Sequence, residues 1–257
     1  MNTLRAFFVR DAQVALSYRI PFFFDVVALL AGAATFHAIG TSIGQEDSFF
    51  VFAIAGLMVL RVGASLARIA HSIEAELAAG TLEFLLSSPL RPASVILSGA
   101  SFELLRGVVL ALLFVPVAVL VFGADLALDA AETYAALLIG LLGAALLFAA
   151  VAAATVATVL LIRQGTALAN AIALTLPILA GAYFPVSVLP QPLELLADIL
   201  PFRLAVDVLR TGLTDGHFEV GKAIALIAGG AAALAGTVLV LQFAVERSRR
   251  LGTLAQT

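Results

Sequence analysis

Few side chains in this sequence have the type and spacing that catalysis or metal binding requires. The segment 216–223 has the spacing of a phosphate-binding loop, but Ala223 stands where a Ser or Thr hydroxyl would hold magnesium, and no buried strand precedes it. The three histidines, His37, His71 and His217, are too scattered for a metal cluster, and no HExxH motif occurs. Cysteine is absent, which excludes thiolate zinc sites and cysteine nucleophiles.

One serine lies in a run of small residues that could expose a nucleophile. Ser65 follows Gly63 and Ala64, but its helical neighbours are Arg61 and Arg68, and no side chain can be named as its general base. We therefore predict that the chain is not an enzyme. We also expect it to bind no metal and no cofactor itself.

The composition indicates a protein that lives in a membrane. Of 257 residues, 12% are charged and 62% are hydrophobic, whereas a soluble domain is nearer a quarter charged. The apolar residues fall into blocks of about 20, the length that crosses a hydrocarbon core of ~30 Å. The net charge of −3 offers no basic face for a phosphate backbone, so we expect no nucleic-acid partner.

The blocks predict an all-α integral membrane protein with six transmembrane helices in one domain, residues 1–257. The predicted spans are 20–39, 49–69, 104–122, 134–162, 167–188 and 222–245. Residues 1–19 carry Leu4, Phe7 and Phe8 at helical spacing, which indicates an interfacial helix. The first span could instead be a signal peptide, but Asp25 inside it, the long leader and the five further spans favour a membrane helix.

The basic residues predict the orientation of the chain. Six crossings place both termini on one side, and eleven of the 14 Lys and Arg residues fall on that side. Cytoplasmic segments are enriched in Lys and Arg, so we expect both termini in the cytoplasm and the protein in the cell membrane. Gly and Ala residues are dense in the fourth and sixth spans, which indicates either tight packing within one chain or a dimer seam.

The cytoplasmic segment 70–103 is predicted to contain a short amphipathic helix. Gly80 is placed to end the helix that continues from the second span, and Thr81 is placed to cap the next one. The segment contributes three acids and three leucines on one face: Glu74, Glu76, Glu83, Leu82, Leu85 and Leu86. The acids disfavour an anionic lipid surface, so the leucine face either binds a partner protein or packs on its own helix bundle.

Two ionisable residues lie inside predicted spans. Arg61 is 12 residues from Phe49, about 18 Å along the helix axis, and an unpaired arginine at that depth is costly. We expect Asp25 to be its partner within the membrane. The alternative is that Arg61 extends its side chain to the inner surface.

The segment 185–221 is predicted to lie outside and to form short helices, because prolines interrupt it. Arg203, Asp207 and Arg210 have the i, i+4, i+7 spacing of an ion-pair ladder. The segment could act as an outer gate over a translocation path or as a surface cap. The residues assigned to this candidate gate are Tyr183, Phe184, Pro185, Pro190, Arg203, Asp207 and Arg210.

Two motifs resemble those of the type-2 permeases of ABC transporters. Residues 76–90 have the pattern Glu-x-x-x-Gly-Thr-Leu-Glu-x-Leu-Leu-x-Ser-Pro-Leu, which resembles the cytoplasmic coupling region of that family. Residues 180–202, followed by 204–210, resemble the family's segment after the fifth helix. The resemblance implies a permease subunit of an exporter that works with a second permease copy or paralogue. It also implies two separate ATPase subunits that bind ATP and Mg.

The same resemblance assigns roles to the short helix at 81–86. Its leucines and the neighbouring acids would contact a groove on the ATPase, and ATP-driven closure of the ATPase pair would move the second and third spans as rigid bodies. We also expect the membrane-spanning helices to be surrounded by membrane lipid. The alternative from another class is a secondary transporter driven by an ion gradient, with Asp25 and Arg61 as coupling charges.

Overall fold

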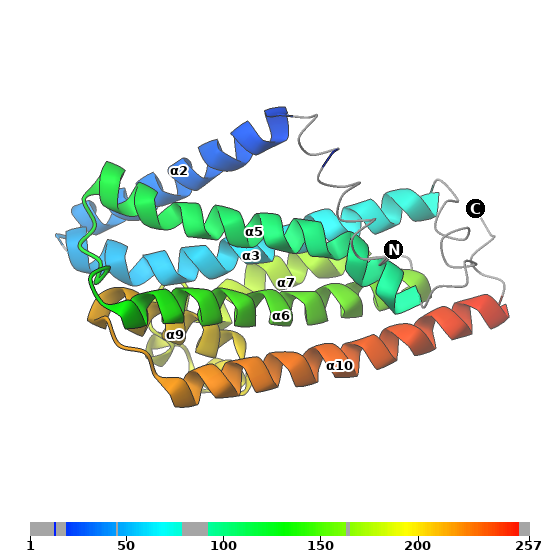
Figure 1. Cartoon of the computed structure of the whole chain (residues 1–257). Coiled ribbons are helices and arrows are strands. Elements are labelled where there is room, and N and C mark those ends of the chain that lie inside the picture. Colours follow the sequence, from blue (N-terminus) through cyan, green and yellow to red (C-terminus); the bar gives the residue numbers. More distant parts are fainter. Residues whose placement is uncertain (1–12, 14–18, 45, 79–91, 163–164, 252–257) are drawn as a thin grey trace.

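The computed structural model describes residue 13 and residues 19–44, 46–78, 92–162 and 165–251. Within these residues the protein is helical and contains no strand (Figure 1). The helices are α2 (Arg19–Ser42), α3 (Glu46–Ala78), α5 (Pro92–Phe122), α6 (Ala131–Ile162), α7 (Gly165–Leu179), the 3-10 turn η1 (Val186–Val188), α8 (Gln191–Ile199), α9 (Phe202–Asp215) and α10 (Val220–Leu251).

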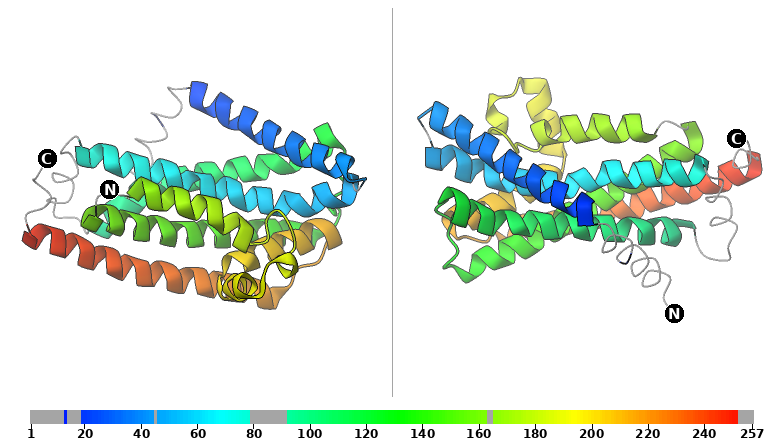
Figure 2. Two further views of the ribbon diagram at one scale, coloured as in Figure 1. Left: turned by 180° about the vertical axis from the view of Figure 1, so that it is seen from behind. Right: turned by 90° about the horizontal axis from the view of Figure 1, so that it is seen from above.

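Five of these helices are long and apolar enough to cross a membrane. They are α2, α3, α5, α6 and α10, and they correspond to five of the six spans predicted from the sequence. Helices α3, α5, α6 and α10 run side by side, and α2 lies obliquely across α3 and α5 with its start tilted away from them (Figures 1 and 2). We call the end of the bundle where α3 ends and α5 begins the linker end. The opposite end, where α9 lies, is the α9 end.

The expected fifth span, 167–188, differs from the structure. The helix there, α7, has 15 residues and ends at Leu179, so it is about 22 Å long against a hydrocarbon core of ~30 Å. The chain turns at Gly181, whose φ of 67° is favourable for glycine, and Pro185 then begins η1. The short helix α9 then packs against α6 and α3 at this end of the bundle, while α8 projects to the side (Figure 2).

The core lies around α3 and α6, while α2 and α10 lie at the periphery. The most apolar stretches of α3 and α6 are largely buried, and those of α2 and α10 are largely exposed. Gly140 of α6 packs against Leu209 of α9, and Gly143 against Leu226 of α10, so these glycines serve packing within one chain. Gly236 of α10 has no neighbour beside its Cα and takes no part in this packing.

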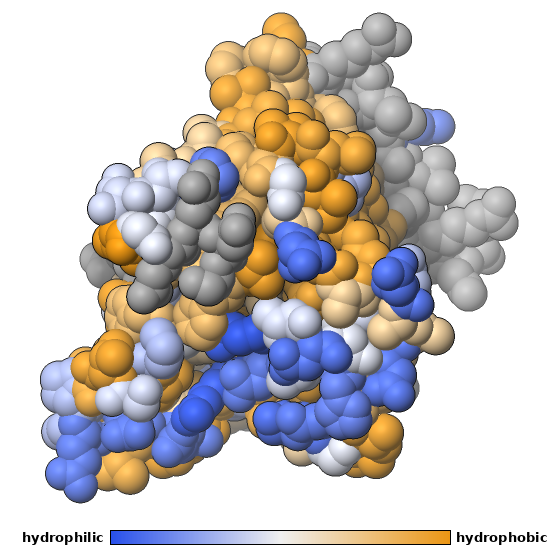
Figure 3. Space-filling model, turned by 90° about the vertical axis from the view of Figure 1, so that its left-hand side faces the viewer, coloured by the Kyte–Doolittle hydropathy of each residue, from blue (hydrophilic) through white to orange (hydrophobic). Residues whose placement is uncertain are grey.

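The α9 end carries the polar surface of the bundle. Figure 3 views this end and shows hydrophilic side chains gathered on its lower half. Glu132 in the first turn of α6 accepts a hydrogen bond from the backbone N–H of Phe218, at 2.7 Å, and its carboxylate lies 3.3 Å from Nδ1 of His217. Gly216, with φ of 62°, ends α9 in the left-handed conformation. The connection between α9 and α10 is thereby fixed to the start of α6.

Candidate functional site

Helix α9 is amphipathic and is held against the bundle by Arg210. Its apolar face buries Phe202, Val206 and Leu209. The Arg210 guanidinium donates hydrogen bonds from Nη2 to the carbonyl of Gly181, at 2.8 Å, and from Nε to the carbonyl of Phe52, at 3.3 Å. Its Cζ atom lies 3.6 Å from the centre of the Phe52 ring, which adds a cation–π contact. One side chain thus joins α9, α3 and the turn after α7.

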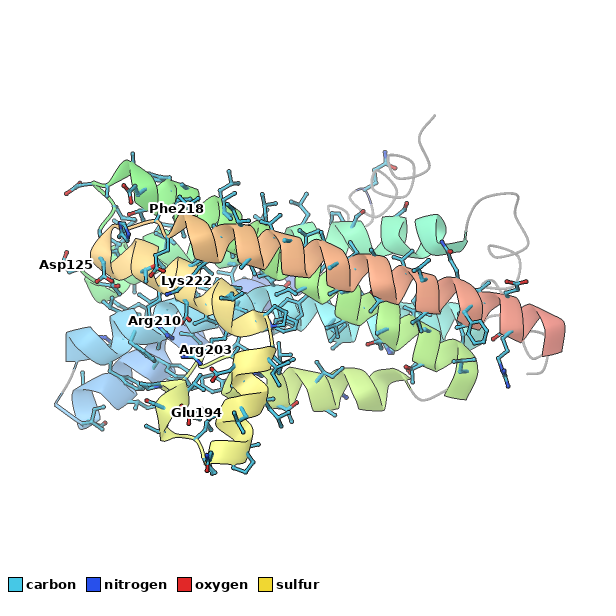
Figure 4. The ribbon with its side chains drawn as sticks, turned by 90° about the horizontal axis from the view of Figure 1, so that it is seen from below. Asp125, Glu194, Arg203, Arg210, Phe218 and Lys222 are labelled. Atoms are coloured by element: carbon cyan, nitrogen blue, oxygen red, sulfur yellow. The ribbon has the colours of Figure 1, made fainter. Side chains whose placement is uncertain are left out.

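The acid that accompanies Arg210 is Asp207, one turn earlier on α9. Its carboxylate lies 3.8 Å from Arg210 Nη1 and 3.7 Å from Arg203 Nε, so the structure brings together the three residues of the expected ladder. Arg203 also pairs with Asp198 of α8. Burial lowers the pKa of Arg210 to about 10, with Asp207 acting in the opposite direction, and the side chain is therefore charged at neutral pH. Figure 4 shows Arg203 and Arg210 together at this end.

The other residues assigned to the outer gate lie between α7 and α8. The Tyr183 ring stacks on Phe36 of α2 with 5.4 Å between ring centres, and Phe36 stacks on Phe49 of α3 at 6.2 Å. Pro185 precedes η1 and Pro190 precedes α8, and both prolines are exposed. Phe184 is half-buried beside Tyr183. The segment therefore contacts α2 directly and reaches the start of α3 through Phe36.

A cluster of five charged side chains joins α2, α3 and α5 toward the linker end. We call it the Asp25 cluster; its members are Asp25, Arg61, Arg68, Glu103 and Arg106. The Asp25 carboxylate pairs with Arg106 and lies 3.8 Å from Nη1 of Arg68. Glu103 completes the cluster, 2.5 Å from Nε of Arg68 and 3.7 Å from Nη1 of Arg106.

The position of Arg61 differs from the expected carboxylate pair. Its Nη2 donates a hydrogen bond to the backbone carbonyl of Asp25, at 3.1 Å, while the carboxylate of Asp25 faces Arg68 and Arg106. Among the described residues Arg61 forms no salt bridge. The guanidinium nevertheless points from the middle of α3 toward the start of α2. The sequence therefore predicted correctly that Arg61 of α3 contacts Asp25 of α2. The acceptor, however, is the backbone carbonyl of Asp25 and not its carboxylate.

Glu103 and Arg106 were not assigned to a site from the sequence. Their i, i+3 spacing near the start of an apolar helix could have identified them, because charges inside a span need partners.

The segment 216–223, whose spacing resembles a phosphate-binding loop, has a structural explanation. Gly216 ends α9, and Lys222 Nζ lies 2.9 Å from the Glu219 carboxylate.

Most residues expected to contact an ATPase lie in the segment 79–91, outside the described residues: Gly80, Thr81, Leu82, Glu83, Leu85 and Leu86. Glu74 and Glu76 lie on α3, which continues past the predicted span to Ala78, and the Glu74 side chain is half-buried. The interfacial helix expected at 1–19 also falls almost entirely outside the described residues. The role of these residues stays a prediction.

Five apolar helices of spanning length in a bundle whose described residues contain no strand define a multi-pass membrane protein. The sequence model of the ABC-2 type transporter family matches residues 5–214, so the chain belongs to that family. It is a membrane permease of an ABC transporter, and such permeases generally pair with an ATPase subunit. A comparison with curated protein sequences gives no match.

Proposed function

We propose that this chain is the permease subunit of an ABC exporter in the cell membrane and forms its translocation path. The observation that carries the proposal is the family match over residues 5–214, which includes both motifs noted in the sequence. The exporting direction rests on the resemblance of those motifs. In this proposal the chain crosses the membrane six times, through the five long helices and through the shorter α7, which runs from the linker end toward the α9 end (Figure 1).

The geometry at the linker end supports coupling to a separate ATPase. Helix α3 extends about three residues past its apolar stretch, which ends at Ala75, and α5 begins six residues before its own stretch, at Pro92. The segment 79–91 joins these extensions, with the leucine face and the acids in or beside it. A force on this segment is transmitted along two rigid helices into the membrane.

The segment 185–221 at the α9 end, with Tyr183 and Phe184 directly before it, is proposed as the outer gate. Arg210 fixes α9 to α3, and Tyr183 contacts α2 through Phe36. Movement of α3 driven from the linker end therefore reaches both the turn after α7 and α9. A second permease copy or paralogue would complete the path, and ATP and Mg would be bound by the ATPase partner.

The coupling is tested by changing the leucine face of the segment 79–91. The tagged chain is purified from its native membrane, and co-purifying proteins are searched for a soluble ATPase with a complete Gly-x-x-x-x-Gly-Lys-Ser/Thr loop. The double change Leu82→Asp and Leu85→Asp is expected to abolish co-purification and transport, because two carboxylates replace the buried apolar contact.

The matched control is Ser87→Asp, which adds a carboxylate to the same segment away from the leucine face. It is expected to leave co-purification intact. If the Leu82/Leu85 variant still binds the ATPase and supports transport, the coupling role of this segment is refuted. The ion-gradient alternative is tested in the same preparation: transport by proteoliposomes that contain the chain without any ATPase would favour a secondary transporter.

A further inference from the structure

The Asp25 cluster contains more positive charge than its acids neutralise. Three guanidinium groups meet two carboxylates, and both carboxylates are engaged by Arg68 and Arg106. Arg61 keeps a backbone carbonyl as its acceptor and no carboxylate within the described residues. An uncompensated charge inside a span is costly, so the cluster, as the described part of the chain forms it, has room for one more anion.

An unfilled hydrogen bond lies in the same cluster. Nη2 of Arg68 is buried and has no acceptor, and it is the only side-chain atom in this condition among the described residues. Buried donors are normally paired, since an unpaired one loses its hydration without replacement. The unbalanced charge and the unpaired donor therefore belong to one group of arginines on one face of α3.

The surroundings of the cluster are apolar and face outward. Phe23 and Phe24 of α2, which precede Asp25, are 62% and 63% exposed, and Leu105 of α5, which precedes Arg106, is 47% exposed. Asp25 lies three residues from the start of its apolar stretch at Phe22, and Arg106 lies eight residues from the start of its own at Ser98. Asp25, Arg68 and Arg106 therefore lie within about 5 to 12 Å of the linker end of their spans, and Arg61 reaches the Asp25 carbonyl from deeper in α3. A ligand that reaches the cluster from the side meets hydrocarbon-like surface first.

We propose that the Asp25 cluster binds the headgroup of an acidic lipid from the leaflet at the linker end. The phosphate or carboxylate of the headgroup would accept hydrogen bonds from Arg61 and Arg68, and its acyl chains would lie along the exposed faces of α2 and α5. Basic groups between membrane helices near the cytoplasmic surface are suited to such headgroups. The proposal concerns a ligand of this chain and does not depend on the exporter function or on the ATPase.

The test is a lipid titration of the intact purified protein in a neutral detergent. Native mass spectrometry counts bound phosphatidylglycerol or phosphatidylcholine with the same acyl chains. Phosphatidylglycerol is expected to bind about fivefold more tightly than phosphatidylcholine, the factor that attraction by one basic residue supports. The change Arg61→Gln should remove this preference, while Arg61→Lys keeps the charge and should retain most of it.

The matched control is Arg247→Gln on α10, an exposed arginine toward the same end of the bundle. It removes an equal charge outside the cluster and should leave the preference unchanged. Equal binding of the two lipids by the unchanged protein overturns the proposal, and so does a preference that survives Arg61→Gln. Inorganic phosphate is titrated as a separate arm, and a free anion that displaces the lipid completely at millimolar concentration would show that the site does not select a lipid.

Discussion

At the scale of single residues, Asp25 is the centre of the contacts between α2 and the rest of the linker end. Its carboxylate faces Arg68 of α3 and Arg106 of α5, while its backbone carbonyl faces Arg61. The side chains of Asp25 and Arg106 are each 15% exposed, so solvent screens their interaction less than that of a surface pair. Removing one carboxylate leaves two guanidinium groups without that partner.

We predict that Asp25 is energetically coupled to Arg106 and hardly coupled to Arg61. Asp25→Asn should lower the free energy of unfolding by about 2 kcal/mol, and the double change with Arg106→Gln should recover part of the loss, giving a coupling of about 1 kcal/mol or more. For Asp25→Asn with Arg61→Gln the coupling should stay below ~0.5 kcal/mol, because Arg61 contacts an atom that the change preserves. The measurement is unfolding in mixed micelles as denaturing detergent is increased. Equal coupling in the two cycles would contradict this assignment.

The sequence predicts part of the Asp25 cluster, because helical spacing shows which charged residues lie inside a span but not which of them face one another. An arginine within an apolar stretch requires an acceptor, and this requirement alone directed attention to Arg61 and Asp25. The rotation and tilt of α2 relative to α3 and α5 decide which guanidinium reaches the carboxylate, and no feature of a single sequence encodes these angles directly. Arg106 therefore takes the place that Arg61 was expected to fill.

At the scale of elements, the close approach of α3 to the turn after α7 depends on one glycine. A Cβ on Gly56 would overlap the carbonyl oxygen and Cα of Ala182, which are backbone atoms and cannot rotate away. The same turn accepts the hydrogen bond of Arg210 at Gly181. The backbone of this turn is thus held on one side by α3 and on the other by α9.

We predict that Gly56→Ala destabilises the protein by about 1 to 3 kcal/mol, the usual cost of overpacking a filled interior. Gly32 of α2 provides the control, because a Cβ there meets no atom. Gly32→Ala should be neutral or stabilising by up to about 1 kcal/mol, since alanine is the better helix former. Thermal unfolding of the detergent-solubilised variants measures both effects. A Gly56→Ala protein as stable as the Gly32→Ala protein would show that α3 and the turn are not packed this closely.

The helices that the sequence predicts well are those whose length and hydropathy are sufficient by themselves. Each of α2, α3, α5, α6 and α10 contains a helical, predominantly apolar stretch of spanning length. The expected span 167–188 is interrupted by the left-handed Gly181 and by Pro185, so its apolar residues are divided between α7 and the turn that follows. The apolar run continues to Val188 although α7 ends at Leu179, so composition alone could not locate the end of this helix.

At the scale of the whole molecule, the two ends of the bundle have different charge. The topology predicted from the sequence assigns eleven of the 14 basic residues to the side of the linker end, whereas the exposed acids Asp125, Asp129, Glu132 and Asp215 belong to the segments at the α9 end. Positively charged segments remain on the cytoplasmic side of a membrane. We therefore predict that the linker end faces the cytoplasm, where an ATPase would have access to it, and that the α9 end faces the opposite side.

The absence of cysteine from the sequence makes this orientation directly measurable. We predict that Asp129→Cys, at an exposed position between α5 and α6, is labelled by a membrane-impermeant maleimide in intact cells. Ser87→Cys, in the segment between α3 and α5, should be labelled only after the membrane is permeabilised, because the bilayer separates it from the reagent. The unchanged protein, which has no thiol, gives the background. Labelling of Ser87→Cys in intact cells would place the linker end outside, where no nucleotide-driven partner could act on it, and the proposed coupling would then be impossible.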